Sequence, residues 1–480
     1  MKNIIITFLV SICLCVNIFA QYGSEGSTDA RSMSLGKTSN AISQGIYSIG
    51  INPANLLNSS SPVDFSTILP LPHLSVTGGT TFLTINNINY YFGAINGQGR
   101  VLTDNDKQNL NSLFNGGGLI FSNMSFTLFS FGLRLDPSIG AFGFSINDFI
   151  EGDFNVPQSI SSLALYGNPL SDSIYTFDDS KFNAWWIRNY SLSYAREIPG
   201  VENGVLQKLS AGVSLKYYQG FAYVQSVQTN GNYFQTGSEN QITLHSNYVV
   251  QSAFSSMFNV KYKDTTQSSG NSSSSNSVSG TPFPSPAGTG FGFDIGFTAN
   301  LVDNWKVSLA VTDVGSITWN QNTAITTSQG QYTITDLTSK SLGDTLKSKF
   351  NGNSVTGGSF TTDLPTALRI GAAHEFYFNE GSFPGSLLLA MDINQGFNDE
   401  PGNSTKTRVS IGGEWKLANG VPYIRTGFSF GGLLGFRWGV GLGIEAGPLE
   451  LNLATMDMES IVAPSSAKYL SIALDSRWMF

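Results

Sequence analysis

The hydrophobic residues of positions 406–480 recur at every second position, segment after segment. Consecutive side chains of a β-strand point to opposite faces, so this period predicts strands with one apolar face and one face of charges and glycines. The last segment, for example, places Ile472 and Leu474 on one face and Asp475 and Arg477 on the other. We expect the face of glycines and charges to point inward and the apolar, aromatic face to contact lipid, which is the pattern of a transmembrane β-barrel.

The same alternation marks fourteen segments of the chain. In order, they are residues 73–85, 121–134, 139–149, 186–196, 208–228, 290–301, 305–318, 365–378, 386–395, 406–417, 421–430, 433–445, 448–456 and 468–480. A single-chain barrel with both ends on the inner side of the membrane needs an even number of strands, which fourteen satisfies. The sequence therefore predicts an all-β fold, a 14-stranded antiparallel transmembrane β-barrel formed by residues 63–480.

The lengths of the connections fit this assignment. Most connections on the inner side are short and rich in Gly, Pro, Asn or Asp. Four connections on the outer side are much longer, namely 86–120, 150–185, 229–289 and 319–364. Short inner turns and long outer loops are typical of such barrels. Residues 240–252 also alternate, but counting them as a membrane strand would reverse every earlier strand, so we expect them to extend outward from the barrel.

The first long outer loop contains a candidate helix. Thr103 followed by Asp106 forms an imperfect capping box, and the apolar side chains of the helix then fall on one side of it. These side chains are Leu110, Leu113 and Phe114. An apolar helix face at the mouth of a barrel favours a groove for a hydrophobic ligand. The alternative is that the three side chains only pack on neighbouring loops, because amphipathic helices usually bury their apolar stripe.

Composition narrows the functional class. Charged residues and aromatic residues each make up 12% of the chain, and glycine is abundant at 52 residues. The mean hydropathy is near zero, as expected when an apolar outer surface is averaged with a polar interior. The formal net charge is −8 and no run of basic residues occurs. Nucleic acid is therefore not an expected partner.

The first 20 residues read as a secretory signal peptide, which implies export and then localisation in the cell outer membrane. Lys2 supplies the positive charge, residues 4–19 the apolar core, and Ala20 the small residue before the cleavage site. The two cysteines, Cys13 and Cys15, lie inside this peptide, so we expect no disulfide and no thiolate metal site. No other stretch offers about 18 consecutive apolar residues, so we expect no transmembrane helix.

Residues 21–62 are mostly small and polar, and they do not alternate. They contain the tripeptide Asn52-Pro53-Ala54 shortly before the first predicted strand. This arrangement resembles the N-terminal plug of the FadL-like long-chain fatty-acid transporters and of the PorV-like outer-membrane proteins. The resemblance implies that residues 21–62 form a plug inside the lumen of the barrel. The alternative is a plain turn or helix end at the Asn-Pro pair.

The inward faces of the predicted strands carry charges of both signs. The lumen-lining charges that we single out are Arg369, Glu375, Arg408, Glu414, Arg425, Arg437, Glu445 and Arg477. One interpretation is that they guide a solute or hold the plug through charge-assisted hydrogen bonds. The alternative is a hydrated ladder of ion pairs that only supports the barrel. Alternating glycines such as Gly439, Gly441 and Gly443 are interpreted as small inward residues that leave room for a plug or a channel.

Aromatic residues near the strand ends are interpreted as a girdle at the membrane interface, where indole rings are favoured. The tryptophans among them are Trp185, Trp186, Trp305, Trp319, Trp415 and Trp438. Trp478 and the terminal Phe480, in phase on the last strand, resemble the C-terminal signature that the barrel-assembly machinery recognises. The expected partners are therefore outer-membrane lipid and that machinery.

No catalytic constellation is evident in the sequence. His73, His245 and His374 stand alone without a partner at metal-ligand spacing, and no nucleophile–base pair is found. We therefore expect no enzyme activity, no metal and no cofactor. Two functions remain: a FadL-like barrel for passive uptake of hydrophobic small molecules, or a PorV-like protein that assists secretion or surface attachment of exported proteins. An apolar pocket joining the loop helix to the plug favours uptake, whereas a lumen packed solid, together with a large exposed apolar surface on the loops, favours the second function.

Overall fold

The computed structural model describes residues 29–480, except for residues 96–97, 137, 167–173, 237–241, 261–282, 335–352, 379–384, 418–420 and 433. The predicted signal peptide and residues 21–28 of the predicted plug lie outside the described residues. Within the described ranges, no helix has both the length and the apolar content needed to cross a membrane.

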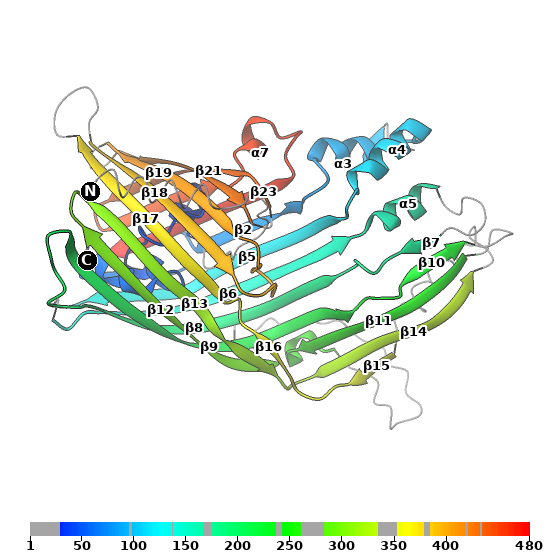
Figure 1. Cartoon of the computed structure of the whole chain (residues 1–480), viewed down its shortest axis with the longest axis horizontal. Coiled ribbons are helices and arrows are strands. Elements are labelled where there is room, and N and C mark those ends of the chain that lie inside the picture. The colour runs from blue at the N-terminus through cyan, green and yellow to red at the C-terminus, as the bar shows by residue number, and fades with distance from the viewer. Residues whose placement is uncertain are drawn as a thin grey trace.

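Fourteen antiparallel strands close into one barrel (Figure 1). The first position in the wall is shared by two short strands, β1 (Val63–Ser66) and β2 (His73–Thr80), which pair with the same two neighbours. The other thirteen strands, in order around the wall, are β5 (Gly118–Arg134), β6 (Ala141–Val156), β8 (Phe182–Glu197), β9 (Leu206–Gln228), β12 (Gly288–Leu301), β13 (Trp305–Trp319), β17 (Ala367–Phe378), β18 (Gly385–Gly396), β19 (Arg408–Lys416), β20 (Tyr423–Gly431), β21 (Arg437–Ala446), β22 (Leu449–Thr455) and β23 (Tyr469–Met479). Strand β23 pairs with β1 and β2, which closes the barrel.

The predicted strand count is confirmed, and each predicted segment coincides with one strand position of the wall. The largest difference is at the first strand, which we expected over residues 73–85. The wall already begins at β1, and the chain leaves the sheet over residues 67–72 before it returns as β2. Pro70 and Pro72 lie in this break, and a proline has no N–H to donate to a neighbouring strand.

One side of the barrel continues far beyond the membrane wall. Strand β11 (Ile242–Phe254) pairs with the outer end of β9 and with β14 (Thr323–Ile334), so this segment extends outward as we expected. The other outer elements are α3 (Ile85–Phe92), β3 (Ala94–Ile95), β4 (Gln98–Gly99), α4 (Asp104–Leu113), α5 (Gln158–Tyr166), β7 (Ile174–Thr176), β10 (Tyr233–Thr236), η3 (Ser256–Phe258), β15 (Asn353–Thr356), β16 (Phe360–Asp363) and α7 (Glu459–Val462). Figure 1 shows α4, α5, β10 and β14 at the end opposite the C-terminus.

Burial along the strands shows which face points inward. In β20, Tyr423, Arg425 and Gly427 are buried, whereas Ile424 and Phe428 between them are exposed on the outer surface. Polar and glycine positions are thus covered by protein, and the apolar positions form the surface that contacts lipid. The predicted assignment of the two faces is confirmed on these C-terminal strands.

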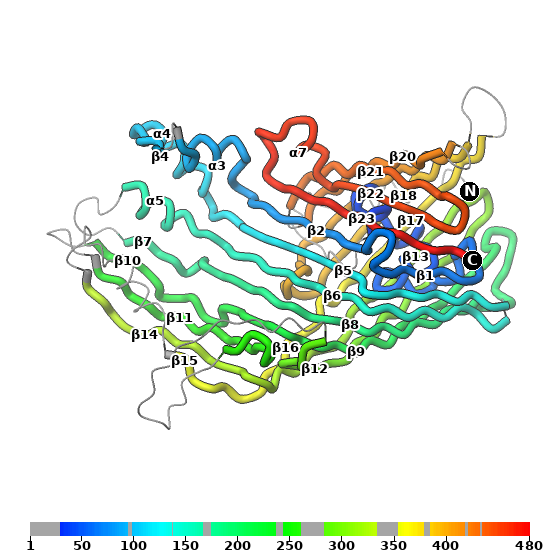
Figure 2. Tube along the Cα trace, turned by 180° about the vertical axis from the view of Figure 1, so that it is seen from behind, coloured from blue at the N-terminus to red at the C-terminus, as the bar shows by residue number. Residues whose placement is uncertain are grey.

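The N-terminal segment, residues 29–58, lies within the barrel (Figure 2). It forms a short helix, α2 (Ala30–Ser34), and two 3₁₀ turns, η1 (Gly45–Ser48) and η2 (Pro53–Asn58). Asp29 caps α2 by accepting a hydrogen bond from Ser32 N, and Asn52 caps η2 by accepting one from Ala54 N. Most of its side chains are buried, because it contacts inward-facing residues of strands all round the wall.

Candidate functional site

A buried ionic network on the C-terminal strands holds one side of the N-terminal segment. Arg31 donates from Nε and Nη2 to the two carboxylate oxygens of Glu414, at 2.8 and 2.9 Å. Arg425 Nε donates to the same carboxylate at 2.6 Å, and Arg425 Nη1 donates to Asn452 Oδ1 at 2.6 Å. Glu414 and Arg425 are buried, and buried charges are stable only when they are paired. Of the predicted lumen charges, Glu414 therefore binds the segment directly, and Arg425 supports it through the shared carboxylate.

Asp475 of β23 extends this network to the backbone of the segment. Its Oδ2 accepts a hydrogen bond from Ala30 N at 2.7 Å, and its Oδ1 accepts one from the Tyr47 hydroxyl at 2.6 Å. The neighbouring Arg477 donates to Glu450 Oε2 at 2.9 Å and therefore stays inside the barrel. The segment is thus fixed to the last strand at two places that are distant in sequence.

A second set of hydrogen bonds holds the opposite side of the segment. Asp392 Oδ2 on β18 accepts from the backbone N–H groups of Ser39 and Asn40, at 2.6 and 2.7 Å. Asn40 Nδ2 in turn donates to the carbonyl oxygens of Ser308 and Arg369, at 3.2 and 3.1 Å. Arg369, another predicted lumen charge, is buried at this contact. Polar contacts thus hold the N-terminal segment on two sides, to β13, β17 and β18 on one side and to β19 and β23 on the other.

The tripeptide Asn52-Pro53-Ala54 both begins η2 and contacts the wall. Asn52 Nδ2 donates to Thr298 Oγ1 of β12 at 3.2 Å. A Cβ at Gly212 or at Gly296 would overlap atoms of this tripeptide. The lack of a side chain at these two positions therefore lets the tripeptide pack directly against the backbone of the wall. The Asn-Pro pair therefore begins a helical turn, as one interpretation predicted, and this turn is also part of the buried N-terminal segment.

Further glycines allow α2 and the residues after it to approach the C-terminal strands. An added Cβ would lie 2.7 Å from Leu35 Cβ at Gly412, 2.5 Å from Met33 O at Gly439 and 2.6 Å from Ser34 Cβ at Gly441. Inward glycines thus leave room for the segment.

Of the remaining predicted charges, Arg408 lies close enough to Asp392 to interact with it electrostatically, and the other three make none of these contacts. Arg408 is buried in the wall, and Arg437 forms a two-point ion pair with Asp457 near the outer end of β21. Glu445 is partly exposed and lies 3.9 Å from Lys416, and Glu375 is also partly exposed. The structure therefore divides the predicted set into charges that hold the segment and charges that only line the wall.

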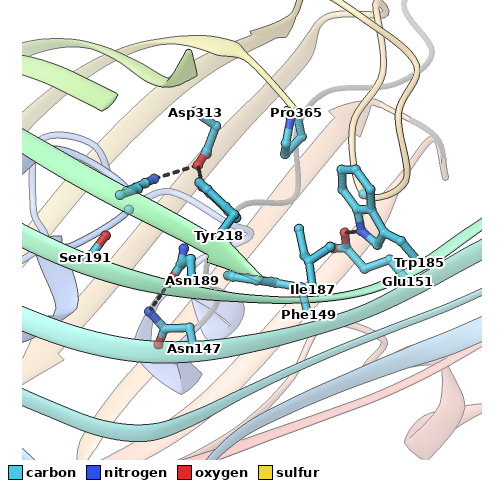
Figure 3. A pocket seen from close by; sticks show the side chains of 13 residues that line it. Asn147, Phe149, Glu151, Trp185, Ile187, Asn189, Ser191, Tyr218, Asp313 and Pro365 are labelled. Atoms are coloured by element: carbon cyan, nitrogen blue, oxygen red, sulfur yellow. Dashed lines mark hydrogen bonds and ion pairs between the residues drawn. The ribbon is translucent and has the colours of Figure 1, made fainter. Parts of the chain in front are cut away.

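A small chamber lies between the N-terminal segment and the β18–β19 loop, residues 397–407. Gly50 lines it from the segment, and Gly402 lines it from the loop. Its apolar lining comes from Phe149, Trp185, Ile187, Tyr218 and Pro365 (Figure 3). The volume is about 30 Å³, which is enough for about two water molecules. The chamber is thus far smaller than the usual site for a small organic molecule.

Fixed polar groups line the same chamber. Lys216 Nζ donates to Asp313 Oδ1 at 2.6 Å and lies 2.8 Å from Asp294 Oδ1. The Tyr218 hydroxyl donates to the same Asp313 oxygen at 2.5 Å. Figure 3 shows the side chains of Tyr218 and Asp313 in this contact. Trp185 Nε1 donates to Glu151 at 2.9 Å. The chamber combines aromatic walls with hydrogen-bonding groups whose positions are fixed.

The β18–β19 loop crosses from one wall of the barrel toward the other. Asn398 Nδ2 donates to Leu364 O at 2.7 Å, and Asn183 Nδ2 of β8 donates to Asp399 O at 3.4 Å. A side chain at Gly402, where φ is +73°, would overlap the Glu151 carboxylate of β6. Burial raises the pKa of Glu400 to about 7, and the nearby charge of Asp363 adds to this effect. The loop thus covers the chamber from the outer side.

The chamber borders a core of buried aromatic residues that sequence reasoning missed. Trp185, Tyr218, Tyr223 and Trp319 are all buried in one cluster inside the barrel. The assignment of Trp185 and Trp319 to the membrane girdle was therefore wrong. Trp185 is in phase with the inward-facing Asn189, and this phase was the signal that could have identified it.

The helix predicted in the first outer loop forms as α4, with the complete Thr103–Asp106 capping box. Leu110 and Phe114 are buried in a cluster with Phe82 and Val156, and Leu113 packs against them. The residues that line the chamber do not include them. The structure therefore brings these three side chains together but separates them from Asn52-Pro53-Ala54.

The break in the wall at residues 67–72 lies next to another small cavity. This cavity, of about 10 Å³, is lined by Tyr47 and Ile49 of the segment and by His73, the first residue of β2. Asn147 lines both this cavity and the chamber. Among the residues that the structure describes, no group of three His, Cys, Asp or Glu side chains could hold a metal ion.

Comparisons with solved structures give matches over nearly the whole chain. They include the Ralstonia pickettii toluene transporter TbuX (13% identity, TM-score 0.47, 95% of this chain and 98% of that chain), the Pseudomonas putida toluene transporter TodX (12%, 0.44, 95% and 98%) and a Pseudomonas aeruginosa FadL homologue (13%, 0.43, 96% and 100%). At these identities and scores the likeness supports no conclusion about function, and none of the comparisons supports the PorV-like alternative. No curated protein sequence matches the chain.

A family model matches residues 59–455, which is most of the chain. It covers the strands from β1 to β22 and ends before β23. The chain belongs to this family, which is described as a family of unknown function, DUF5723.

Proposed function

We propose that the protein is a passive outer-membrane channel for the uptake of hydrophobic small molecules. The predicted pocket between the loop helix and Asn52-Pro53-Ala54 does not form within the described residues. The observation that carries this proposal is instead the chamber between Gly50 and Gly402, with Phe149, Trp185 and Ile187 in its wall. Apolar and aromatic walls with a few fixed polar groups are typical of small-molecule sites. The chamber lies inside the barrel, so a molecule that enters it has left the outer medium.

Passage requires two movements, because the chamber of about 30 Å³ is smaller than any organic substrate. On the outer side, the β18–β19 loop moves away from Glu151 and Asn183 and admits the molecule. On the inner side, residues 21–62 act as the plug and shift to release it. No cofactor and no energy source are needed, since the molecule moves down its concentration gradient.

The break at residues 67–72 is the proposed exit toward lipid. It interrupts the hydrogen bonds of the first strand, and the cavity beside it shares Asn147 with the chamber. The exposed Ile68 and Leu69 of the break are apolar, as a route into hydrocarbon requires. A hydrophobic molecule would then leave sideways and would not need to cross the polar inner end.

The test is the uptake of a radiolabelled aromatic hydrocarbon and of a labelled long-chain fatty acid. We expect a strain without the gene to take up one of them more slowly, and the wild-type gene to restore the rate. Ile187→Trp, which fills the chamber, should not restore it when the amount in the outer-membrane fraction matches wild type. Ile411→Trp on the lipid face is the matched control and should restore uptake. Equal uptake with and without the gene would overturn the proposal.

A further inference from the structure

The wall of the barrel has a notch at the outer end of β22. Strand β22 pairs with β21 only as far as Val440↔Thr455 and with β23 only as far as Ala454↔Ala473. The two flanking strands continue outward to Arg437 and Tyr469. Residues 456–468, which include α7, connect β22 to β23 at this level. At this level the N–H of Met458, the residue before α7, donates to Trp438 O at 2.9 Å in place of strand pairing.

A cleft of about 370 Å³ lies at this notch, within the range of about 300–1,000 Å³ that is usual for small-molecule sites. Three aromatic residues, Phe436, Trp438 and Tyr469, line it together with Val462. Its charged lining consists of Arg437, Asp457 and Glu459. It is more than ten times larger than the chamber inside the barrel, and it shares no lining residue with that chamber.

The cleft opens on the surface that contacts lipid. Phe436 and Trp438 both stack on Phe428, at ring distances of 6.1 and 6.0 Å, and Phe428 lies on the exposed face of β20. Phe436 is 59% exposed, and Val462 is 60% exposed. A ligand can therefore place an apolar chain between these two side chains, near the outer boundary of the membrane.

The charges of the cleft leave an excess of negative charge. Arg437 is neutralised by Asp457, which accepts two hydrogen bonds of 2.8 Å from it. The Glu459 carboxylate takes part in none of the ion pairs found within the described ranges. One positive and two negative groups give the lining a net charge of −1. An anionic ligand is disfavoured here, and a cationic ligand is favoured.

We propose that this cleft binds an amphiphilic organic cation, namely a substituted ammonium group attached to an aliphatic chain. The ammonium group lies against Phe436 and Trp438 and close to Glu459, because a cation is attracted both to an aromatic face and to a carboxylate. Tyr469 does not contribute in this way, since the guanidinium of Arg437 lies over its ring. The aliphatic chain lies between Phe436 and Val462. The same ammonium chemistry occurs in a free amphiphile and in the head group of an ethanolamine lipid.

The test titrates the purified full-length protein, in an uncharged maltoside detergent, with hexyltrimethylammonium and with hexanesulfonate, by calorimetry. We expect the cation to bind at least about tenfold more tightly than the sulfonate with the same chain. Glu459→Gln should weaken binding of the cation by about tenfold and leave the sulfonate unchanged. Glu202→Gln, at an exposed carboxylate of an inner turn, is the matched control and should change neither.

Val462→Trp provides a second variant, since it fills the cleft from an exposed position that is not needed for folding. It should abolish binding of the cation. Equal affinity for the cation and the sulfonate, or an unchanged affinity in Glu459→Gln, would overturn the proposal. Nanodiscs with and without ethanolamine lipid distinguish the two sources: weaker binding of the probe with that lipid identifies the head group, and equal binding identifies a free amphiphile.

Discussion

Arg31 of the N-terminal segment and Glu414 of β19 share two hydrogen bonds, although 383 positions separate them in the sequence. Both side chains are buried or nearly so, with exposed fractions of 11% and 2%. Arg425 donates to the same carboxylate and also lies 3.9 Å from Glu450. Glu414 thus bonds to two guanidinium groups, of which, within the described residues, only Arg425 has a second acid within 4 Å. Glu414 is therefore the central residue of the network that holds the segment.

Glu414→Gln should loosen the segment, because it leaves Arg31 and Arg425 buried without their carboxylate. Loss of one partner of a buried ion pair costs about 3–5 kcal/mol. We expect faster hydrogen exchange of residues 29–58, measured by mass spectrometry. Glu445→Gln is the control. Glu445 is 37% exposed and its ion pair with Lys416 is long, at 3.9 Å, so its loss should leave hydrogen exchange unchanged. The same protection in Glu414→Gln as in wild type would contradict this role.

Gly412 and Gly413 are adjacent residues that face opposite sides of the wall. An added Cβ at Gly412 would lie 2.7 Å from Leu35 Cβ, whereas at Gly413 its nearest neighbour would be 3.4 Å away. We expect Gly412→Val to displace the segment and to raise the single-channel conductance in planar bilayers. Gly413→Val should behave as wild type. If the two variants show equal conductance, the segment does not depend on this close approach.

Packing of the β18–β19 loop should depend on pH through Glu400. Burial, with a contribution from Asp363, raises the pKa of this carboxyl from 4.5 to about 7 in the packed loop. Because the pKa is higher in the packed loop than in the open loop, protonation favours packing. The gain is complete below pH 4.5 and is lost as the pH rises through about 7. Asp399, the neighbour of Glu400 in the loop, interacts with Lys406 and with Asp153.

A spin label at residue 405 can measure this transition. We expect a less mobile label at pH 5 than at pH 8 in the wild-type protein. Glu400→Gln, which carries no charge at either pH, should keep the label immobile at both values. A wild-type label whose mobility is equal at the two values would rule out control of the loop by Glu400.

Lys216 should be essential for the stability of the barrel interior. Its ammonium group lies between Asp294 and Asp313, so Lys216→Met would leave two buried carboxylates side by side. We expect a loss of about 3–5 kcal/mol, seen as a lower midpoint of thermal unfolding. The triple variant that adds Asp294→Asn and Asp313→Asn should recover most of this loss. No recovery would mean that packing, and not the unpaired charge, is responsible.

The wall of the barrel could be predicted from the sequence because each strand has a period of two and one apolar face. The inward glycines could be predicted for the same reason. Sequence alternation does not reveal bulges, however: Trp319 is in phase with the lipid-facing Val307 and Leu309, but the bulge at Thr312 and Asp313 of β13 turns it inward. Alternation also does not distinguish lipid from other apolar surroundings. The same limit applies to the charged pair Arg188–Asp148, which lies in phase with the lipid-facing residues and is shielded by Phe221 and Phe283.

The chamber could be predicted only in part. Asn147 and Asn189 lie in the inward phase of their strands and hydrogen-bond to each other, but the outer cover of the chamber depends on how the β18–β19 loop folds back. Loop conformation has no period to reveal it. For α4, the capping box predicted where the helix begins, but it could not indicate that Phe82 and Val156 would cover its apolar face.

The hydrogen bond from Ala30 to Asp475 connects positions 445 residues apart, near the two ends of the described chain. A contact of this separation cannot form early, because the last strand must first exist and take its place beside β1. Pairing of β23 with β1, which closes the barrel, and attachment of the N-terminal segment to β23 are therefore coupled steps of folding. A nascent chain stalled before β23 would have an open seam and an unanchored leading end at the same time.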